Sequence, residues 1–213
     1  SDVLVETANK GTDTVYSSVS FALRDHSQHL EVLNLTGSGN INGTGNGRAN
    51  TISGNSGDNV LNGASGNDTL IGGDGNDTFR DNNGADRMEG GAGNDTFYAG
   101  AGSDAMYAGQ DTDEDTFIFS ALTDSVNGIN RDRIYQFDSG EDKLNFAALD
   151  ANTSSSGNQA FAYSGSAADA NSLWWLDSGS DILVRGDVTG DGVYDFEVQV
   201  MGINALVEDD FIL

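Results

Sequence analysis

GNGRANTIS at 45–53 is followed by GNSGDNVLN, GASGNDTLI, GGDGNDTFR, DNNGADRME, GGAGNDTFY and AGAGSDAMY, which run without a gap to Tyr107. Each of these seven nonapeptides has a large apolar residue in its eighth place: Ile52, Leu61, Leu70, Phe79, Met88, Phe97 and Met106. The sixth place holds Asn50, Asn59, Asp68, Asp77, Asp86, Asp95 and Asp104, and the fourth place is glycine in six of the seven units. A flexible linker would not keep an apolar residue in register seven times, so this period predicts stacked structural repeats.

Each unit divides into a turn and a short strand. Glycine followed by Asn-Asp disfavours a helix, because glycine loses the most backbone freedom, but it suits a tight turn. In the three residues after the turn, the middle side chain points inward and its neighbours point outward. One unit cannot bury its single apolar residue, so units must stack. We expect two units per coil, with residues eighteen apart superimposed at a rise of ~4.8 Å in a parallel β-helix.

The turns also offer oxygen ligands to a hard cation. Ca²⁺ prefers carboxylates and main-chain carbonyls, and both occur in each turn. The eighteen-residue stacking predicts the carboxylate pairs Asp68/Asp86, Asp86/Asp104 and Asp77/Asp95, with weaker sites at Asn50 and Asn59. The candidate ligands are the side chains of Asp68, Asp77, Asp86, Asp95, Asp104 and Asn59 and the turn carbonyls, which we place at Gly66, Gly75, Gly84, Gly93 and Gly102. Asp113 and Asp115, with Asp111, either close a last calcium site or are exposed acids.

The composition fits a protein that needs cations to fold. Nine basic residues oppose thirty-four acidic ones, for a net charge of −25. Such a surface repels itself, and about four to five Ca²⁺ ions would offset part of the charge. We therefore expect folding to depend on calcium. Nucleic acid is not an expected partner because basic residues are few, and membrane insertion is not expected because no apolar run reaches spanning length.

The flanks of the repeat have a different pattern. Residues 1–44, with strand-like stretches at Val3–Val5, 14–16, 19–21 and 32–35, predict an N-terminal β cap of irregular coils. Ile41 precedes Ile52 by eleven residues, which suggests the same ladder with a two-residue insertion. On the other side Phe117 follows Met106 by eleven, so the β-roll of residues 45–116 should end its regular period there.

Residues 117–213 predict an antiparallel β cap. Its inward positions in one hairpin are expected to be Ile182, Val184, Phe196, Val198 and Val200. The turn from Asp187 to Asp195 has Asp and Gly where an EF-hand loop needs them, but Val198 stands in place of the bidentate Glu. A hairpin turn and a calcium loop therefore both remain open.

The repeats from Gly63 to Tyr107 resemble RTX proteins, the β-roll family exported by bacterial type I secretion. DTFIFSAL at 115–122, DRIYQFDSGEDKLNFAAL at 132–149 and DDFIL at 209–213 are similar to the C-terminal parts of serralysin-type proteases, and similar modules are the R-modules of mannuronan epimerases. The resemblance implies a right-handed parallel β-roll, calcium at the sixth-place aspartates, a secreted, extracellular location, and contact with the type I secretion machinery. Arg48, Asn50, Asn59 and Asp81 depart from the family pattern.

Two functions remain after enzyme motifs are considered. HExxH and GxSxG are absent from the sequence, so we expect no catalysis by this chain. The first function is a non-catalytic calcium-binding module that folds on Ca²⁺ after secretion and supports an attached extracellular enzyme. The chain begins at Ser1, and we expect it to be one module of a longer protein. The alternative is an alginate-binding module, in which Arg80 and Tyr98 lie side by side on the outer face and hold a sugar acid.

Overall fold

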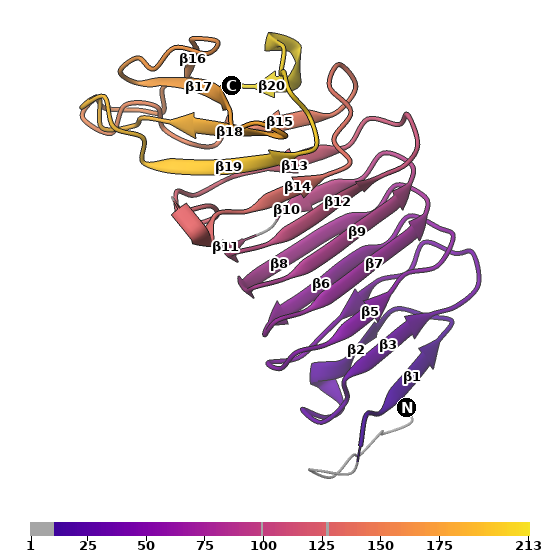
Figure 1. The fold of residues 1–213 in the computed structure, drawn as a ribbon. Coiled ribbons are helices and arrows are strands. Elements are labelled where there is room, and N and C mark those ends of the chain that lie inside the picture. The colour runs from indigo at the N-terminus through magenta and orange to yellow at the C-terminus, as the bar shows by residue number, and fades with distance from the viewer. Residues whose placement is uncertain (1–10, 99, 127) are drawn as a thin grey trace.

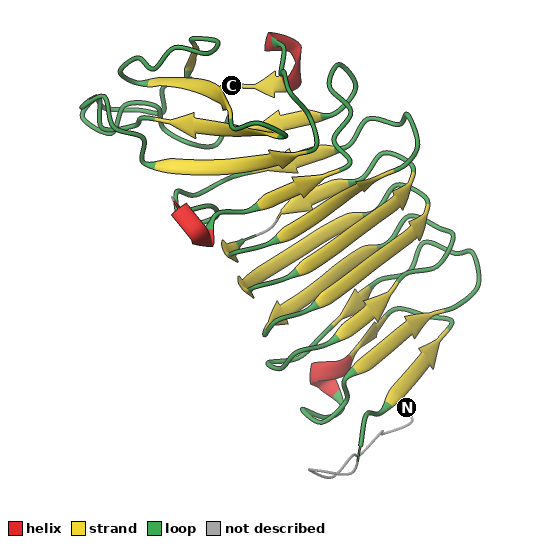
Figure 2. Ribbon diagram, viewed as in Figure 1, coloured by secondary structure: helices red, strands yellow, loops and turns green. Residues whose placement is uncertain are grey.

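A computed structural model describes residues 11–98, 100–126 and 128–213, so the expected strand at Val3–Val5 lies outside the described residues. Two β-sheets face each other and the chain winds between them as a solenoid (Figure 1). Strand and loop account for nearly all of the described chain, and helix is confined to three short 3₁₀ turns, η1 (Leu23–Asp25), η2 (Gly128–Asn130) and η3 (Glu208–Asp210) (Figure 2). None of the described helices is long and apolar enough to cross a membrane.

Successive strands fall alternately in the two sheets until the last part of the chain. The first sheet has the spatial order β1 (Thr14–Ser17), β3 (Val32–Leu35), β5 (Thr51–Ser53), β7 (Thr69–Asp74), β9 (Arg87–Ala92), β12 (Ala105–Gly109), β14 (Arg133–Tyr135), β19 (Phe196–Met201), β18 (Asp181–Gly186), β17 (Ser172–Asp177) and β16 (Ala162–Tyr163). The second has the order β2 (Phe21–Ala22), β4 (Gly43–Thr44), β6 (Val60–Ser65), β8 (Thr78–Gly84), β10 (Thr96–Tyr98), β13 (Thr116–Ile118), β15 (Lys143–Asn145) and β20 (Phe211–Ile212), and β11 (Ala101–Gly102) also pairs with β8.

The eighteen-residue register predicted from the sequence is confirmed. Leu70 lies opposite Met88 in the parallel pair β7–β9, and Phe79 lies opposite Phe97 in the parallel pair β8–β10. Two nonapeptides therefore make one coil, and consecutive units contribute one strand to each sheet.

The apolar eighth places form the core between the sheets. The seven predicted residues from Ile52 to Met106 are at most 1% exposed. The phenyl ring of Phe97 stacks between those of Phe79 and Phe117, with centroid separations of 4.8 Å and 4.7 Å. Each coil buries only one large side chain per sheet, so the hydrophobic stabilisation depends on contacts between coils rather than within one coil.

At the N-terminal side the structure corrects one register. Gly43, not Ile41, occupies the apolar place, because β4 pairs Gly43 with Leu61 eighteen residues later. A Cβ on Gly43 would lie 2.8 Å from Ile52 Cγ2, so a side chain from the facing sheet already fills this space. The prediction of an Ile41 ladder with a two-residue insertion is therefore wrong. Further upstream, Leu33 lies opposite Ile52 and Val15 opposite Leu33, so parallel pairing extends through β1.

At the C-terminal side the two-residue slip before Phe117 is confirmed, since Phe97 lies opposite Phe117 twenty residues later. Parallel strand pairing nevertheless continues past the end of the regular period, from Phe117 to Leu144 and from Met106 to Ile134. The antiparallel arrangement predicted for residues 117–213 is therefore limited to β17, β18 and β19. The predicted hairpin is also confirmed: β18 and β19 pair antiparallel, with Ile182 opposite Val200. Because β19 also pairs with β14 in parallel, the antiparallel cap continues the first sheet of the roll (Figure 1).

Candidate calcium sites

The sixth-place residues form two columns, one at each edge of the roll. In the first carboxylate column, the backbone N–H of each residue donates to Oδ1 of the aspartate one coil later: Asn50 to Asp68 (2.6 Å), Asp68 to Asp86 (2.7 Å), Asp86 to Asp104 (2.8 Å) and Asp104 to Asp132 (2.8 Å). The second carboxylate column repeats this pattern: Asn59 to Asp77 (2.7 Å), Asp77 to Asp95 (2.7 Å), Asp95 to Asp115 (2.8 Å) and Asp115 to Asp142 (2.9 Å). The structure thus stacks the aspartate pairs that the sequence placed together.

The other carboxylate oxygen is the one that a cation could use. Within the part of the chain that the structure describes, Oδ2 is buried without a hydrogen-bond partner in Asp68, Asp77, Asp81, Asp86, Asp95, Asp104 and Asp132. These seven side chains are between 0% and 4% exposed. Oδ2 of the half-buried Asp111 is also buried without a hydrogen-bond partner. A buried carboxylate oxygen without a partner costs free energy, and a metal ion removes that cost. The donor set therefore fits Ca²⁺, which takes several oxygen ligands.

The turn glycines supply the second part of this cradle. A Cβ on Gly84 would overlap the carbonyl oxygen of Gly66, and a Cβ on Gly102 would overlap that of Gly84. In the other column, a Cβ on Gly93 would overlap the carbonyl oxygen of Gly75. The fourth-place carbonyls therefore point toward the next coil, beside the aspartates, and glycine is required because no side chain fits between them.

Burial sets the protonation of these carboxyls. It raises the pKa of Asp68, Asp77, Asp104 and Asp115 to about 7 and that of Asp81 and Asp95 to about 8, while Asp142 rises to about 6. Burial also raises the pKa of Asp86, and that of Asp132 lies well above its usual range. Hydrogen bonds from backbone N–H groups oppose the rise but do not cancel it. Without a counter-ion, these groups therefore keep their protons to a higher pH than exposed carboxyls do.

The remaining predicted ligands differ in their surroundings. The side-chain oxygen of Asn59 already accepts the N–H of Asn55, and its amide donates to the carbonyl of Ile41. Asp115 is buried in the second column, whereas Asp113 is exposed in the loop before it. Asp115 therefore belongs to the second column, whereas Asp113 does not. The side-chain amide of Asn59 is already used in hydrogen bonds within the protein.

Three aspartates of these columns are not predicted as ligands by the nonapeptide pattern. Asp132 and Asp142 extend the columns by one coil, although 28 and 27 residues separate them from Asp104 and Asp115. Each stands two residues before a buried apolar residue, Ile134 or Leu144, and that Asp-x-apolar spacing is the surviving signal of the repeat. Asp81 occupies a glycine place and lies within 4.8 Å of Asp68 and Asp86, measured between one carboxylate oxygen of each.

The loop between β18 and β19 has no spare carboxylate of this kind. Asp187 is fully buried, and its Oδ1 accepts the N–H of Gly190 (2.6 Å) while its Oδ2 accepts that of Gly192 (2.8 Å). Asp195 accepts the N–H of Val188 (2.8 Å). These bonds are those of a hairpin turn closed by its own side chains.

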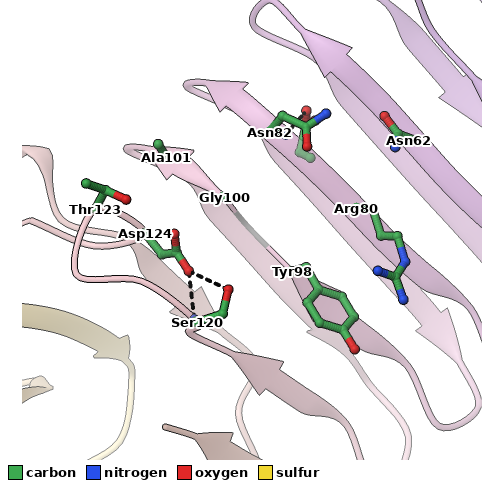
Figure 3. A pocket seen from close by; sticks show the side chains of 10 residues that line it. Asn62, Arg80, Asn82, Tyr98, Gly100, Ala101, Ser120, Thr123 and Asp124 are labelled. Carbon is green, nitrogen blue, oxygen red and sulfur yellow. Dashed lines mark hydrogen bonds between the residues drawn. The ribbon is translucent and has the colours of Figure 1, made fainter. Parts of the chain in front are cut away.

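Arg80 and Tyr98 lie side by side on neighbouring strands β8 and β10, as predicted (Figure 3). The guanidinium carbon of Arg80 lies 4.4 Å from the ring centroid of Tyr98. They line an open cavity of about 520 Å³ with polar neighbours that include Asn62, Asn82 and Ser120. The pair is a cation–π contact on the outer face, and its polar atoms reach solvent.

Comparison with known proteins agrees with this geometry. Residues 44–79 and 81–114 match the family described as the RTX calcium-binding nonapeptide repeat, in four copies. These segments are RTX calcium-binding repeats. The RTX repeats cover units that contribute to both carboxylate columns, and the columns continue beyond them to Asp132 and Asp142. The comparison with curated proteins finds no match.

Two solved structures are similar to the chain. The R3 subunit of the AlgE6 mannuronan C5-epimerase from Azotobacter vinelandii has 22% identity and a TM-score of 0.45, over 83% of this chain and 80% of that one. The R2 subunit of the same epimerase has 26% identity and a TM-score of 0.38, over 76% and 91%. Both TM-scores are below 0.5, so the assignment of a parallel β-roll rests on the strand pairing of this chain.

Proposed function

We propose that this chain is a non-catalytic calcium-binding module that folds when Ca²⁺ fills the two carboxylate columns, and that it supports an extracellular protein to which it is attached. In low-calcium cytosol, no cation offsets the negative charge of the two columns. Export to a calcium-rich exterior supplies the ions. Secretion through a type I machinery belongs to this proposal, and it rests on the RTX repeats alone.

The observation that carries the proposal is the set of buried Oδ2 atoms without partners. They recur coil after coil beside carbonyls that point toward the next coil, as an array of ion sites requires. In the folded roll, hydrogen bonds within the protein use Oδ1, so each carboxylate is oriented with Oδ2 left for the ion.

Counting bound ions tests the proposal. Native mass spectrometry in excess calcium is expected to show about four to five ions per chain. Asp77→Asn keeps the Oδ1 that accepts the N–H of Asn59 but replaces Oδ2 by an amide nitrogen, which cannot bind a cation. The variant should lose at least one ion, whereas Asp169→Asn, at an exposed position in the cap, should lose none. A wild-type chain without bound calcium, or an Asp77→Asn variant with the full number, would contradict the proposal.

A second candidate function is binding of an anionic polysaccharide such as alginate. The Arg80–Tyr98 contact favours it, because a guanidinium can pair with a sugar carboxylate while an aromatic ring stacks on the sugar. The surrounding amides and hydroxyl offer further hydrogen bonds to a saccharide. The high negative charge of the chain opposes it, so binding would need calcium.

Calorimetry with alginate oligomers in excess calcium tests this second function. We expect measurable heat for the wild type and at least a tenfold weaker affinity for Arg80→Ala, because the variant removes the only charge complementary to the sugar acid at this contact. Arg24→Ala, at an exposed residue of η1, is the matched control and should bind as the wild type does. Absence of heat in the wild type removes this candidate and leaves the calcium-binding module unaffected.

A further inference from the structure

Asp81 lies where every other described unit has glycine. The first places of the repeat are Gly45, Gly54, Gly63, Gly72 and Gly90, and Ala99 is the remaining exception outside the described residues. In the second column, a Cβ on Gly72 or Gly90 would overlap Oδ2 of the adjacent aspartate, Asp77 or Asp95. A first-place side chain is therefore directed into the space beside the column.

The carboxylate of Asp81 fills that space in the first column. A Cβ on Gly63, one coil below, would overlap the Oδ2 atoms of both Asp68 and Asp81. One oxygen each of Asp68, Asp81 and Asp86 lies within 4.8 Å of the others, and the three side chains are 2% to 4% exposed. Oδ2 of each has no hydrogen-bond partner among the described residues, while Oδ1 of Asp81 accepts the N–H of Asn82 (2.9 Å).

The strand pairing changes where this side chain enters. The register between β6 and β8 shifts at Ala64, which pairs with Asp81. The positive φ of Ala64 (80°) belongs to the repeat itself, because the second-place residues Gly73, Gly91 and Gly100 also have positive φ, between 77° and 119°. The register shift is therefore the local feature that accompanies the third carboxylate.

We propose that Asp68, Asp81 and Asp86 form a three-carboxylate calcium site that binds its ion more tightly than any other turn of the roll. This inference rests on the proposed calcium-binding function. Calcium affinity rises with the number of charged ligands, and elsewhere in the regular repeats a stacked pair supplies only two. Asp81 also lines the 520 Å³ cavity beside Arg80, which gives the ion a path from solvent. The site lies in the middle coils, so the first ion to bind organises the centre of the roll.

Competition with a chromophoric chelator resolves the affinities of individual ions. The wild type is expected to show one ion that binds at least tenfold more tightly than the rest. Asp81→Asn, which keeps the shape, should weaken this ion by at least tenfold and leave the other affinities unchanged. Asp81→Gly places glycine, the usual first-place residue of the repeat, at this position. It removes the same carboxylate, and the coil has no side chain to accommodate there. Asp25→Asn, at an exposed residue of η1, is the control and should match the wild type.

Lanthanum provides a second readout. Three carboxylates neutralise La³⁺ fully, so the preference of the tightest site for La³⁺ over Ca²⁺ should fall at least tenfold in Asp81→Asn. The inference is overturned if the affinity of the tightest site is unchanged in both Asp81 variants. It is also overturned if the affinities of all sites fall equally. A wild-type chain that binds no calcium overturns instead the function on which it rests, and the two failures are thereby distinguished.

Discussion

Removal of calcium is expected to unfold the chain. With a chelator in excess at pH 8, the two carboxylate columns place buried charges above one another, and a net charge of −25 adds repulsion over the whole surface. Far-UV circular dichroism should lose its β-sheet signal, and the hydrodynamic radius from size-exclusion chromatography should approach that of an unfolded chain. Restored calcium should reverse both changes. Magnesium at the same concentration is the control, because it demands a stricter octahedral geometry and dehydrates reluctantly.

Acidification should partly replace calcium. The raised pKa values, about 7 to 8 for most column aspartates, mean that the folded state binds protons more tightly than the unfolded state. Their contribution to stability is thus fully present below the unfolded pKa near 4 and is lost as pH rises through 7 to 8. The chelated chain should therefore be more compact at pH 5 than at pH 8, and calcium affinity should fall as pH drops below 7. A chelated chain that is equally folded at pH 5 and pH 8 would contradict the first expectation, and a calcium affinity that does not change below pH 7 would contradict the second.

Phe97→Ala is expected to cause the largest loss among single substitutions in the core. Phe97 is fully buried between two stacked rings, and its removal leaves a cavity that neither sheet can close without breaking the register. A buried Phe→Ala change costs about 3–5 kcal/mol, and the loss of two aromatic contacts places this one toward the upper end.

Denaturant unfolding in saturating calcium measures this loss. Val193→Ala, at a residue 60% exposed in the β18–β19 loop, is the control and should change the free energy of unfolding by less than about 0.5 kcal/mol. A cost below about 1 kcal/mol for Phe97→Ala would show that the aromatic stack is not the main source of contact between coils.

The sequence predicts the fold where the repeat is complete. Seven apolar residues and the sixth-place aspartates determine the coil length, because each must meet its copy eighteen residues later. At Gly43 the pattern fails, since the apolar place there is filled by Ile52 of the facing sheet rather than by a side chain of its own. Ile41 is the nearest apolar residue, so the sequence alone places the ladder there.

Beyond the repeat, the site could be predicted only in part. Loops of unequal length separate Asp132 and Asp142 from the preceding coils, so no fixed period leads to them. Asp81 breaks the pattern at a glycine, and only the stacking of coils shows that its carboxylate faces Asp68 and Asp86. The hairpin of the cap was predictable because its alternation depends on local sequence alone.

The N–H-to-carboxylate bonds of both columns all run in one direction. Each coil donates to the coil that follows it, so every aspartate N–H is satisfied only after the next coil is in place. The roll is therefore a polar assembly, with chemically different ends. Its last regular donors, Asp104 and Asp115, are satisfied by Asp132 and Asp142, which lie in the segment that leads into the cap. Loss of that segment would leave these two buried N–H donors unpaired, so the C-terminal end of the columns must be closed.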